Sequence, residues 1–305
     1  MNIVGILIRQ VIIMFSLMFV GYVCYKRKII SDQGSADIGK LLLHVVIPVV
    51  VISNFWVERT PEKTQTLIYS FIIALIGMIT AIVISCLVFH KSDRIAEFST
   101  AFSNAGFIGI PLVQASLGSG AVFYISMMIV LINLLQWTYG VYTITDDKSV
   151  MDVRKVMKSP IVVSVIIGLA VYFTQIPMPS IISSLFTSIS AINTPLAMFV
   201  SGVYLAQSEL LKMLQRKNNY LVSAVRLLLL PVITLLVFKV LPFGSDELKM
   251  AILIAAACPV GSNVAIFAQQ YNRDYREGVE HVCVSTLLSI VTLPLVVMLA
   301  EMMMG

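Results

Sequence analysis

Ten apolar runs, each long enough to cross a lipid bilayer, account for most of this 305-residue chain. An α-helix rises about 1.5 Å per residue, so roughly 20 apolar residues span a hydrocarbon core about 30 Å thick. Composition agrees, because 58% of the residues are hydrophobic, 12% are charged and the mean hydropathy is +0.94. The sequence therefore predicts an all-α integral membrane protein with ten transmembrane helices. The runs lie near residues 3–25, 38–56, 66–89, 96–117, 121–144, 160–176, 181–207, 219–241, 248–270 and 279–301.

The runs divide the chain into two halves of five. Residues 1–145 hold the first five and residues 160–305 hold the second five, with a connector at 146–159 that is too short for a soluble domain. After an odd number of crossings the chain is on the other side, so the second half enters the membrane in the opposite direction. This is the arrangement of inverted-repeat secondary transporters.

The basic residues predict the orientation, because Lys and Arg are retained on the cytoplasmic side. Most of the 21 Lys and Arg residues fall in the odd-numbered connectors, and only four fall in the even ones. Both termini are therefore expected outside, in a multi-pass protein of the cell membrane. The odd connectors hold Lys26, Arg27, Lys28, Lys40, Lys91, Arg94, Lys148, Arg154, Lys155, Lys158, Lys212, Arg216, Lys217, Arg273 and Arg276.

The fourth and ninth runs contain residues that interrupt a helix. SNAGFIGIPLV, at residues 103–113, and CPVGSNVAIF, at 258–267, both combine glycine, proline and asparagine. Backbone groups freed by an interruption have no partner in lipid, so they are tolerated where they line a cavity or bind something. Paired interruptions in the two halves point to a binding site. The alternative is a pair of proline-kinked helices packed by small residues.

The candidate binding residues follow from these interruptions. In the fourth run they are Asn104, Gly106 and Pro111. In the ninth run they are Pro259, Gly261 and Asn263. Unwinding exposes N–H groups with partial positive charge at one new helix end, and the two amides add neutral donors and acceptors.

Three segments resemble the auxin efflux carrier family: FSNAGFIGIPLVQASLG, CPVGSNVAIFAQQYN and the LPLVV of the last run. The most specific element is N-x-G-x-x-G-I-P-L. The resemblance implies a fold similar to the bile-acid and sodium–proton carriers, with helices 4 and 9 crossing near Pro111 and Pro259. It implies a scaffold of helices 1, 2, 6 and 7, a mobile transport domain of helices 3–5 and 8–10, and a homodimer. By the same analogy, Asn133 and Gln136 of the fifth run lie near the site.

Two departures from the plant members bear on the substrate. The long cytoplasmic loop of many plant carriers is absent, and of the acid and lysine near the start of their third span, Glu62 matches the acid while Thr66 replaces the lysine. The short form is similar to bacterial carriers of malonate or malate.

Charged residues inside the runs are few. Arg226 is expected to extend to the cytoplasmic interface, and Glu97, Glu209, Glu280 and Glu301 are placed at span ends. With no acid deep in a span, the protein is either a uniporter or one whose coupling ion is held by backbone carbonyls and amides.

Enzymatic motifs are absent from the sequence. The three histidines are isolated, and neither a phosphate-binding G-x-x-x-x-G-K-[ST] loop nor a G-x-S-x-G motif occurs. We expect no enzyme activity, cofactor or metal, and no nucleic-acid partner, because the cations are confined to short connectors.

The expected function is secondary transport of a small organic anion, a mono- or dicarboxylate such as malonate, malate or an auxin-like acid, by alternating access at the crossing. One alternative is a symporter or antiporter of the bile-acid type, coupled to sodium or protons. A second is a receptor or scaffold in the membrane that transports nothing.

Overall fold

The computed structural model describes residues 3–89, 93–147, 157–271 and 273–304. Within these residues the chain is helical throughout and has no β-strand, only an isolated bridge between Ser103 and Val260. Most of the predicted connector at 146–159 lies outside the described residues, as do Lys91, Lys148, Arg154 and Lys155. The predicted all-α membrane class is confirmed.

The helices of the first half are α1 (Ile3–Lys26), α2 (Asp32–Leu41), α3 (Ile47–Phe55), α4 (Pro61–Phe89), α5 (Arg94–Ala101), α6 (Ile110–Leu117), α7 (Val122–Leu135) and α8 (Val141–Thr145). Those of the second half are α10 (Pro160–Thr174), α11 (Ser180–Ala191), α12 (Asn193–Gln207), α13 (Leu210–Gln215), α14 (Lys217–Ala224), α15 (Leu230–Val240), α16 (Asp246–Ala257), α17 (Asn263–Gln270) and α18 (Tyr275–Met304). Several begin at a side-chain cap. The Ser159 hydroxyl accepts from the Val162 amide ahead of Pro160, and Asp93 accepts from Ala96.

In the described residues, seven continuous helices are long and apolar enough to cross a membrane. They are Val4–Lys26, Asp32–Phe55, Pro61–Phe89, Ser119–Thr145, Ser180–Gln207, Lys217–Val240 and Tyr275–Met304. Two apolar helices are shorter, Ala105–Leu117 and Pro160–Thr174. The fourth and ninth predicted runs are broken, as the glycine and proline pattern predicts, into α5 with α6 and α16 with α17.

Among the described residues, four π-helical segments widen the helices: Leu42–Val46, Ala105–Gly109, Gln136–Gly140 and Val225–Leu229. Three of them end two residues before a proline, at Pro48, Pro111 and Pro231. A proline has no N–H for the carbonyl one turn earlier, so the preceding turn widens. Such bulges are frequent at functional sites.

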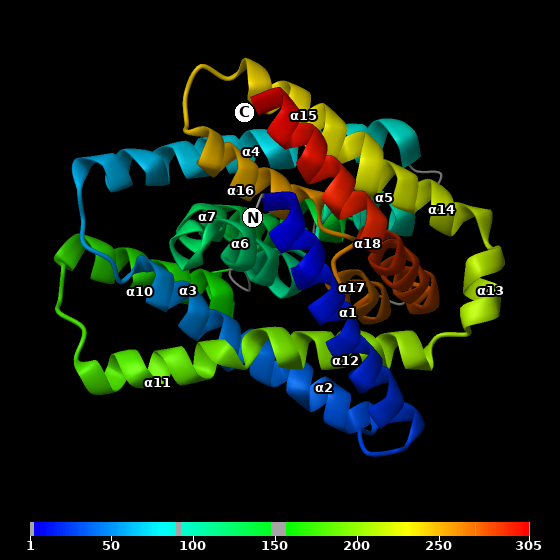
Figure 1. Cartoon of the computed structure of the whole chain (residues 1–305). Coiled ribbons are helices and arrows are strands. Elements are labelled where there is room, and N and C mark those ends of the chain that lie inside the picture. The colour runs from blue at the N-terminus through cyan, green and yellow to red at the C-terminus, as the bar shows by residue number, and fades with distance from the viewer. Residues whose placement is uncertain (1–2, 90–92, 148–156, 272, 305) are drawn as a thin grey trace.

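The helices gather into two groups. One contains α1, α2, α3, α10, α11 and α12, and the other contains α4, α5, α7 and α14 to α18. Figure 1 shows α2, α11 and α12 along the lower edge of the view, and α4, α14 and α15 along the upper edge. In the first group the backbones of α1 and α12 are in direct contact. A Cβ on Gly21 would lie 2.5 Å from the Phe199 carbonyl oxygen, and one on Gly202 would clash with that of Met18.

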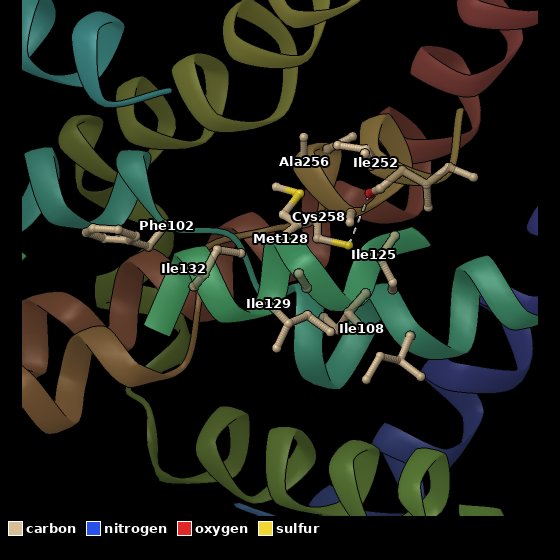
Figure 2. Packing of buried hydrophobic residues seen from close by; sticks show 14 of the residues in the cluster. Phe102, Ile108, Ile125, Met128, Ile129, Ile132, Ile252, Ala256 and Cys258 are labelled. Carbon is tan, nitrogen blue, oxygen red and sulfur yellow. Dashed lines mark hydrogen bonds between the residues drawn. The ribbon is translucent and has the colours of Figure 1, made fainter. Parts of the chain in front are cut away.

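The core of the second group forms between α7 and α16. Figure 2 shows side chains of α7 facing Cys258 and the end of α16, and the residues that it labels on both helices are buried. They are Ile125, Met128, Ile129, Ile132, Ile252, Ala256 and Cys258. This apolar packing holds the breaks of both interrupted segments in place.

Candidate functional site

The two breaks meet at the centre of the molecule. The chain is extended around Ser103 and Val260, which pair in antiparallel fashion. The Asn104 amide donates to the Pro259 carbonyl at 2.8 Å, and the Gly261 amide donates to the Phe102 carbonyl at 3.0 Å. These two bonds satisfy backbone groups that lipid could not satisfy. The two broken segments therefore meet in a short two-stranded contact, which we call the crossing. It lies beside Pro259 but eight residues before Pro111, near which the sequence places it.

A side chain from a third helix completes the contact. The Ser285 hydroxyl of α18 accepts from the Val260 amide at 3.1 Å. Gly261 has the closest approach to the other segment, because a Cβ there would lie 3.2 Å from the Ser103 carbonyl oxygen. A side chain at 261 would therefore require the two segments to separate slightly.

Both helices that leave the crossing begin with an asparagine. The Asn104 side chain accepts from the Phe107 amide at 3.4 Å and donates to the Ser262 hydroxyl at 3.1 Å. The Asn263 side chain donates to Oε1 of Gln136 at 3.0 Å. Helix N-termini carry unpaired N–H groups and about half a positive charge each. Two of them face the same region.

A pocket of about 40 Å³ lies at these N-termini, and we call it the crossing pocket. About 10–15 Å³ of such space holds one water, so it admits about three waters or one carboxylate group. Its described lining residues include no charged side chain. They are Leu43, Ile47, Ser103, Asn104, Ala105, Gly106, Phe107, Ile129, Ile132, Asn133, Gln136, Ile161, Gly261, Ser262 and Asn263.

Two polar atoms in the crossing pocket have no partner among the described residues. They are Nε2 of Gln136, on a side chain that is 1% exposed, and Oγ of Ser103, a residue that also lines a separate cavity of about 10 Å³. An unpaired buried donor costs about 1–3 kcal/mol. One free hydroxyl and one free amide nitrogen, beside two helix N-termini, form a site suited to an anion.

Most of the predicted site residues line the crossing pocket: Asn104, Gly106, Asn133, Gln136, Gly261 and Asn263. The two prolines do not. Pro111, in the first turn of α6, lines a separate cavity, and Pro259 contributes its carbonyl to the backbone pairing. The Asn133 amide donates to the Ile129 carbonyl of its own helix at 2.8 Å. Sequence reasoning missed Ser103 and Ser262, because hydroxyl residues give no distinctive signal in apolar helices.

Two larger cavities flank the crossing pocket. One, of about 530 Å³, includes Lys40 and shares Leu43, Phe107, Ser262 and Asn263 with the pocket; we call it the Lys40 cavity. The other, of about 580 Å³, is lined by polar groups such as Asn54, Gln114 and Asn193; we call it the Asn193 cavity.

The crossing pocket is separated from the Asn193 cavity by a thin layer. Ile47 lines the crossing pocket, and Val50, three residues later, lines the Asn193 cavity. Likewise Phe107 lines the pocket, and Pro111, four residues later, lines the cavity. Three or four residues of helix correspond to about 5 Å. The pocket thus adjoins the Lys40 cavity, and about one helical turn of protein separates it from the Asn193 cavity.

The prediction for Arg226 was wrong, and Glu97, which lies in the first turn of α5 at a span end as predicted, is buried. Arg226 does not extend to the interface: it is 2% exposed and donates to the carbonyls of Thr100, Ala256 and Cys258. Glu97 is 6% exposed and accepts from the Tyr139 hydroxyl at 2.5 Å. In both cases tertiary partners, which a hydropathy window does not contain, keep the charged group inside.

A multi-span helical protein with a polar pocket at two broken helices has the architecture of a membrane transporter. The chain belongs to the membrane transport protein family, whose family model matches residues 6–152 and 145–297. The resemblance to the auxin efflux carriers and the prediction of a transporter instead of an enzyme are confirmed.

Relatives with similar lengths support this assignment. The chain is 22% identical over 303 residues to the uncharacterized transporter YfdV of Escherichia coli strain K12, covering 92% of this chain and 93% of the relative. It is 23% identical over 297 residues to a putative malonate transporter of Rhizobium meliloti strain 1021, covering 91% of each.

Proposed function

We propose that this protein is a secondary carrier for a small organic anion, a mono- or dicarboxylate, which binds at the crossing pocket. The observation that carries the proposal is the pair of unpartnered polar groups, Gln136 Nε2 and Ser103 Oγ, at two helix N-termini with no acidic residue among the described lining. Hydrogen bonds to a charged group contribute about 1.5–3 kcal/mol, more than those between neutral groups.

The substrate class follows from the shape of the site. The crossing pocket admits one carboxylate, and the Lys40 cavity that adjoins it has room for the remainder of a small acid. The printed name of the Rhizobium relative, putative malonate transporter, agrees with this chemistry. Malonate is therefore the first ligand to test, with malate and an auxin-like aromatic acid as comparisons.

We propose ten membrane spans in two inverted repeats. The seven continuous spans are joined by α10 and by the two broken pairs, α5 with α6 and α16 with α17. In the backbone pairing, the bond from Asn104 to Pro259 is matched by one from Gly261 to Phe102 on the other side of Ser103 and Val260. Any antiparallel bridge has this local reciprocity, so the support for the repeat comes from the two broken pairs, one in each half of the chain.

We propose that transport proceeds by alternating access between the two helix groups. The group containing α1 and α12 serves as the scaffold, and the group containing the crossing moves against it. Closure of the Lys40 cavity and opening of the one-turn layer at Ile47 and Phe107 would expose the pocket to the other side.

The test is equilibrium binding to the purified full chain. Malonate and other carboxylates should raise the midpoint of thermal unfolding, whereas malonamide, which is neutral and similar in shape, should not. Gln136→Glu keeps Oε1 as an acceptor for Asn263 and replaces the free donor with a carboxylate oxygen. We expect it to weaken malonate binding about tenfold or more.

Gln114→Glu is the matched control, because it adds the same charge in the Asn193 cavity. Malonate affinity should stay within about twofold there, since one helical turn of protein separates this position from the crossing pocket. Failure of every carboxylate to bind, or an equal loss in both variants, would contradict the proposed anion site.

A further inference from the structure

Arg226 lies at the opposite end of the crossing from the pocket. It belongs to the π-helical segment between α14 and α15, and its guanidinium is fully enclosed. Nη1 donates to the Thr100 carbonyl of α5 at 2.8 Å, Nη2 to the Ala256 carbonyl of α16, and Nε to the Cys258 carbonyl at 3.0 Å. One side chain thus joins the C-terminal ends of both broken helices.

The charges of this arrangement balance. Each helix C-terminus carries about half a negative charge, so α5 and α16 together present about one. The guanidinium supplies one positive charge. Among the described residues, no carboxylate lies within ion-pair distance of Arg226. A buried cation without partners is strongly unfavourable, so the carbonyl ends are what hold it.

Other carbonyls at these ends already have partners. The Thr100 hydroxyl donates to the carbonyls of Ala96 and Glu97, and the Cys258 thiol donates to that of Ile254. Arg226 contacts three further carbonyls at these ends, those of Thr100, Ala256 and Cys258. Carbonyls of unwound helix ends are the ligands that hold a coupling sodium ion in carriers with broken helices.

Little space is left beside the guanidinium. The cavity that it lines has a volume of about 10 Å³, which is room for about one water. A sodium ion at these carbonyls would have to displace the arginine, and the two positive charges would repel each other. The carbonyl oxygens that could bind a cation are present, and they accept hydrogen bonds from the Arg226 guanidinium instead.

We propose that Arg226 acts as a resident cation of the crossing, taking the position of a coupling sodium ion, so that anion binding needs no added cation. It is a positioning residue: it neutralises and holds the carbonyl ends, while the opposite N-termini remain positive toward the pocket. The effect on anion binding rests on the proposed function. The neutralisation of the carbonyl ends rests on the contacts of Arg226 alone.

The first experiment uses the wild-type full chain. Malonate affinity is measured in sodium, potassium and choline chloride at equal ionic strength. We expect values within twofold of one another. A tenfold loss of affinity when choline replaces sodium would overturn the proposal, and this result needs no variant.

The second experiment replaces the cation. Arg226→Ala should lower the midpoint of thermal unfolding by roughly 5 °C or more, because the paired carbonyl ends lose their neutralising charge. Millimolar guanidinium chloride should recover most of the loss by entering the vacated space. Arg226→Lys keeps the charge, so its unfolding midpoint should lie between those of the wild type and Arg226→Ala. If the alanine variant does not fold, the lysine variant is tested in its place.

Arg9→Ala is the matched control, because Arg9 is exposed on α1. Guanidinium should not stabilise this variant or the wild type. Equal midpoints for Arg226→Ala and the wild type, or equal stabilisation of all proteins by guanidinium, would contradict the role of Arg226. If no carboxylate binds the wild type, the proposed function fails, and the guanidinium experiment still decides the proposal for Arg226.

Discussion

The Asn104 amide and the Pro259 carbonyl, 155 positions apart in the sequence, form a 2.8 Å hydrogen bond at the point where both interrupted segments leave the helical conformation. The bond from Gly261 to Phe102 lies next to it. With Arg226 joined to both carbonyl ends, the two segments are fastened to each other and to the α14–α15 helix. They would therefore move as one body.

Asn104→Asp should separate the structural role of this residue from its electrostatic role. The aspartate oxygen can still accept from the Phe107 amide, so the helix start and the unfolding midpoint should be largely preserved. Its charge would face the bound carboxylate. Two like charges about 4 Å apart repel by about 4 kcal/mol at an effective dielectric constant of 20, so malonate affinity should fall at least tenfold.

Isothermal titration gives the affinity of Asn104→Asp, and thermal unfolding gives its stability. Gln65→Glu, an exposed position near the start of α4, is the control that adds the same charge away from the pocket. Unchanged affinity in Asn104→Asp would remove Asn104 from the anion site.

Gly261→Ala should destabilise the crossing. The new Cβ would lie 3.2 Å from the Ser103 carbonyl oxygen and 3.3 Å from that of Phe102, so the two segments would have to separate slightly. We expect a loss of about 1–3 kcal/mol in the free energy of unfolding. Gly120→Ala, where no heavy atom lies within 4 Å of the new Cβ, should change it by less than about 0.5 kcal/mol. Equal unfolding midpoints for both variants would contradict the close approach.

Tyr139→Phe should destabilise the protein through Glu97. Removing the hydroxyl leaves a buried carboxylate without its 2.5 Å donor, which costs about 1–3 kcal/mol. Adding Glu97→Gln to this variant should cause little further loss, because the charge is then gone. Tyr220→Phe, which removes a hydroxyl from an exposed residue, serves as the control in the same thermal unfolding assay. Additive losses in the double variant would show that the two residues act independently.

The orientation predicted from the basic residues is tested by labelling single cysteines. A membrane-impermeant maleimide applied to intact cells should label positions 62 and 247 and leave 216 unlabelled, because Arg216 belongs to a basic connector. Lys155, also predicted to be cytoplasmic, lies outside the described residues. The reverse pattern would place both termini inside. The background for these variants lacks Cys24, Cys86, Cys258 and Cys283.

The sequence predicts the breaks and most of the pocket because their causes are local. Glycine, proline and asparagine close together interrupt a helix wherever it packs, and the same pattern in both halves marks Asn104 and Asn263. The position of Arg226 has a different origin. Its partners Thr100 and Ala256 lie 126 and 30 residues away, so a helix considered alone gives no reason for the side chain to point inward. Pro231, two residues beyond the widened turn that holds Arg226, was the available signal.

The glycine contacts between α1 and α12 have a practical consequence for following motion. Because Gly21 and Gly202 let one backbone rest directly on the other, we expect α1 and α12 to move as one unit. These two helices therefore provide a fixed origin of coordinates within the molecule. Spectroscopic distances measured from probes on α1 or α12 to any other helix then report the displacement of that helix relative to this pair.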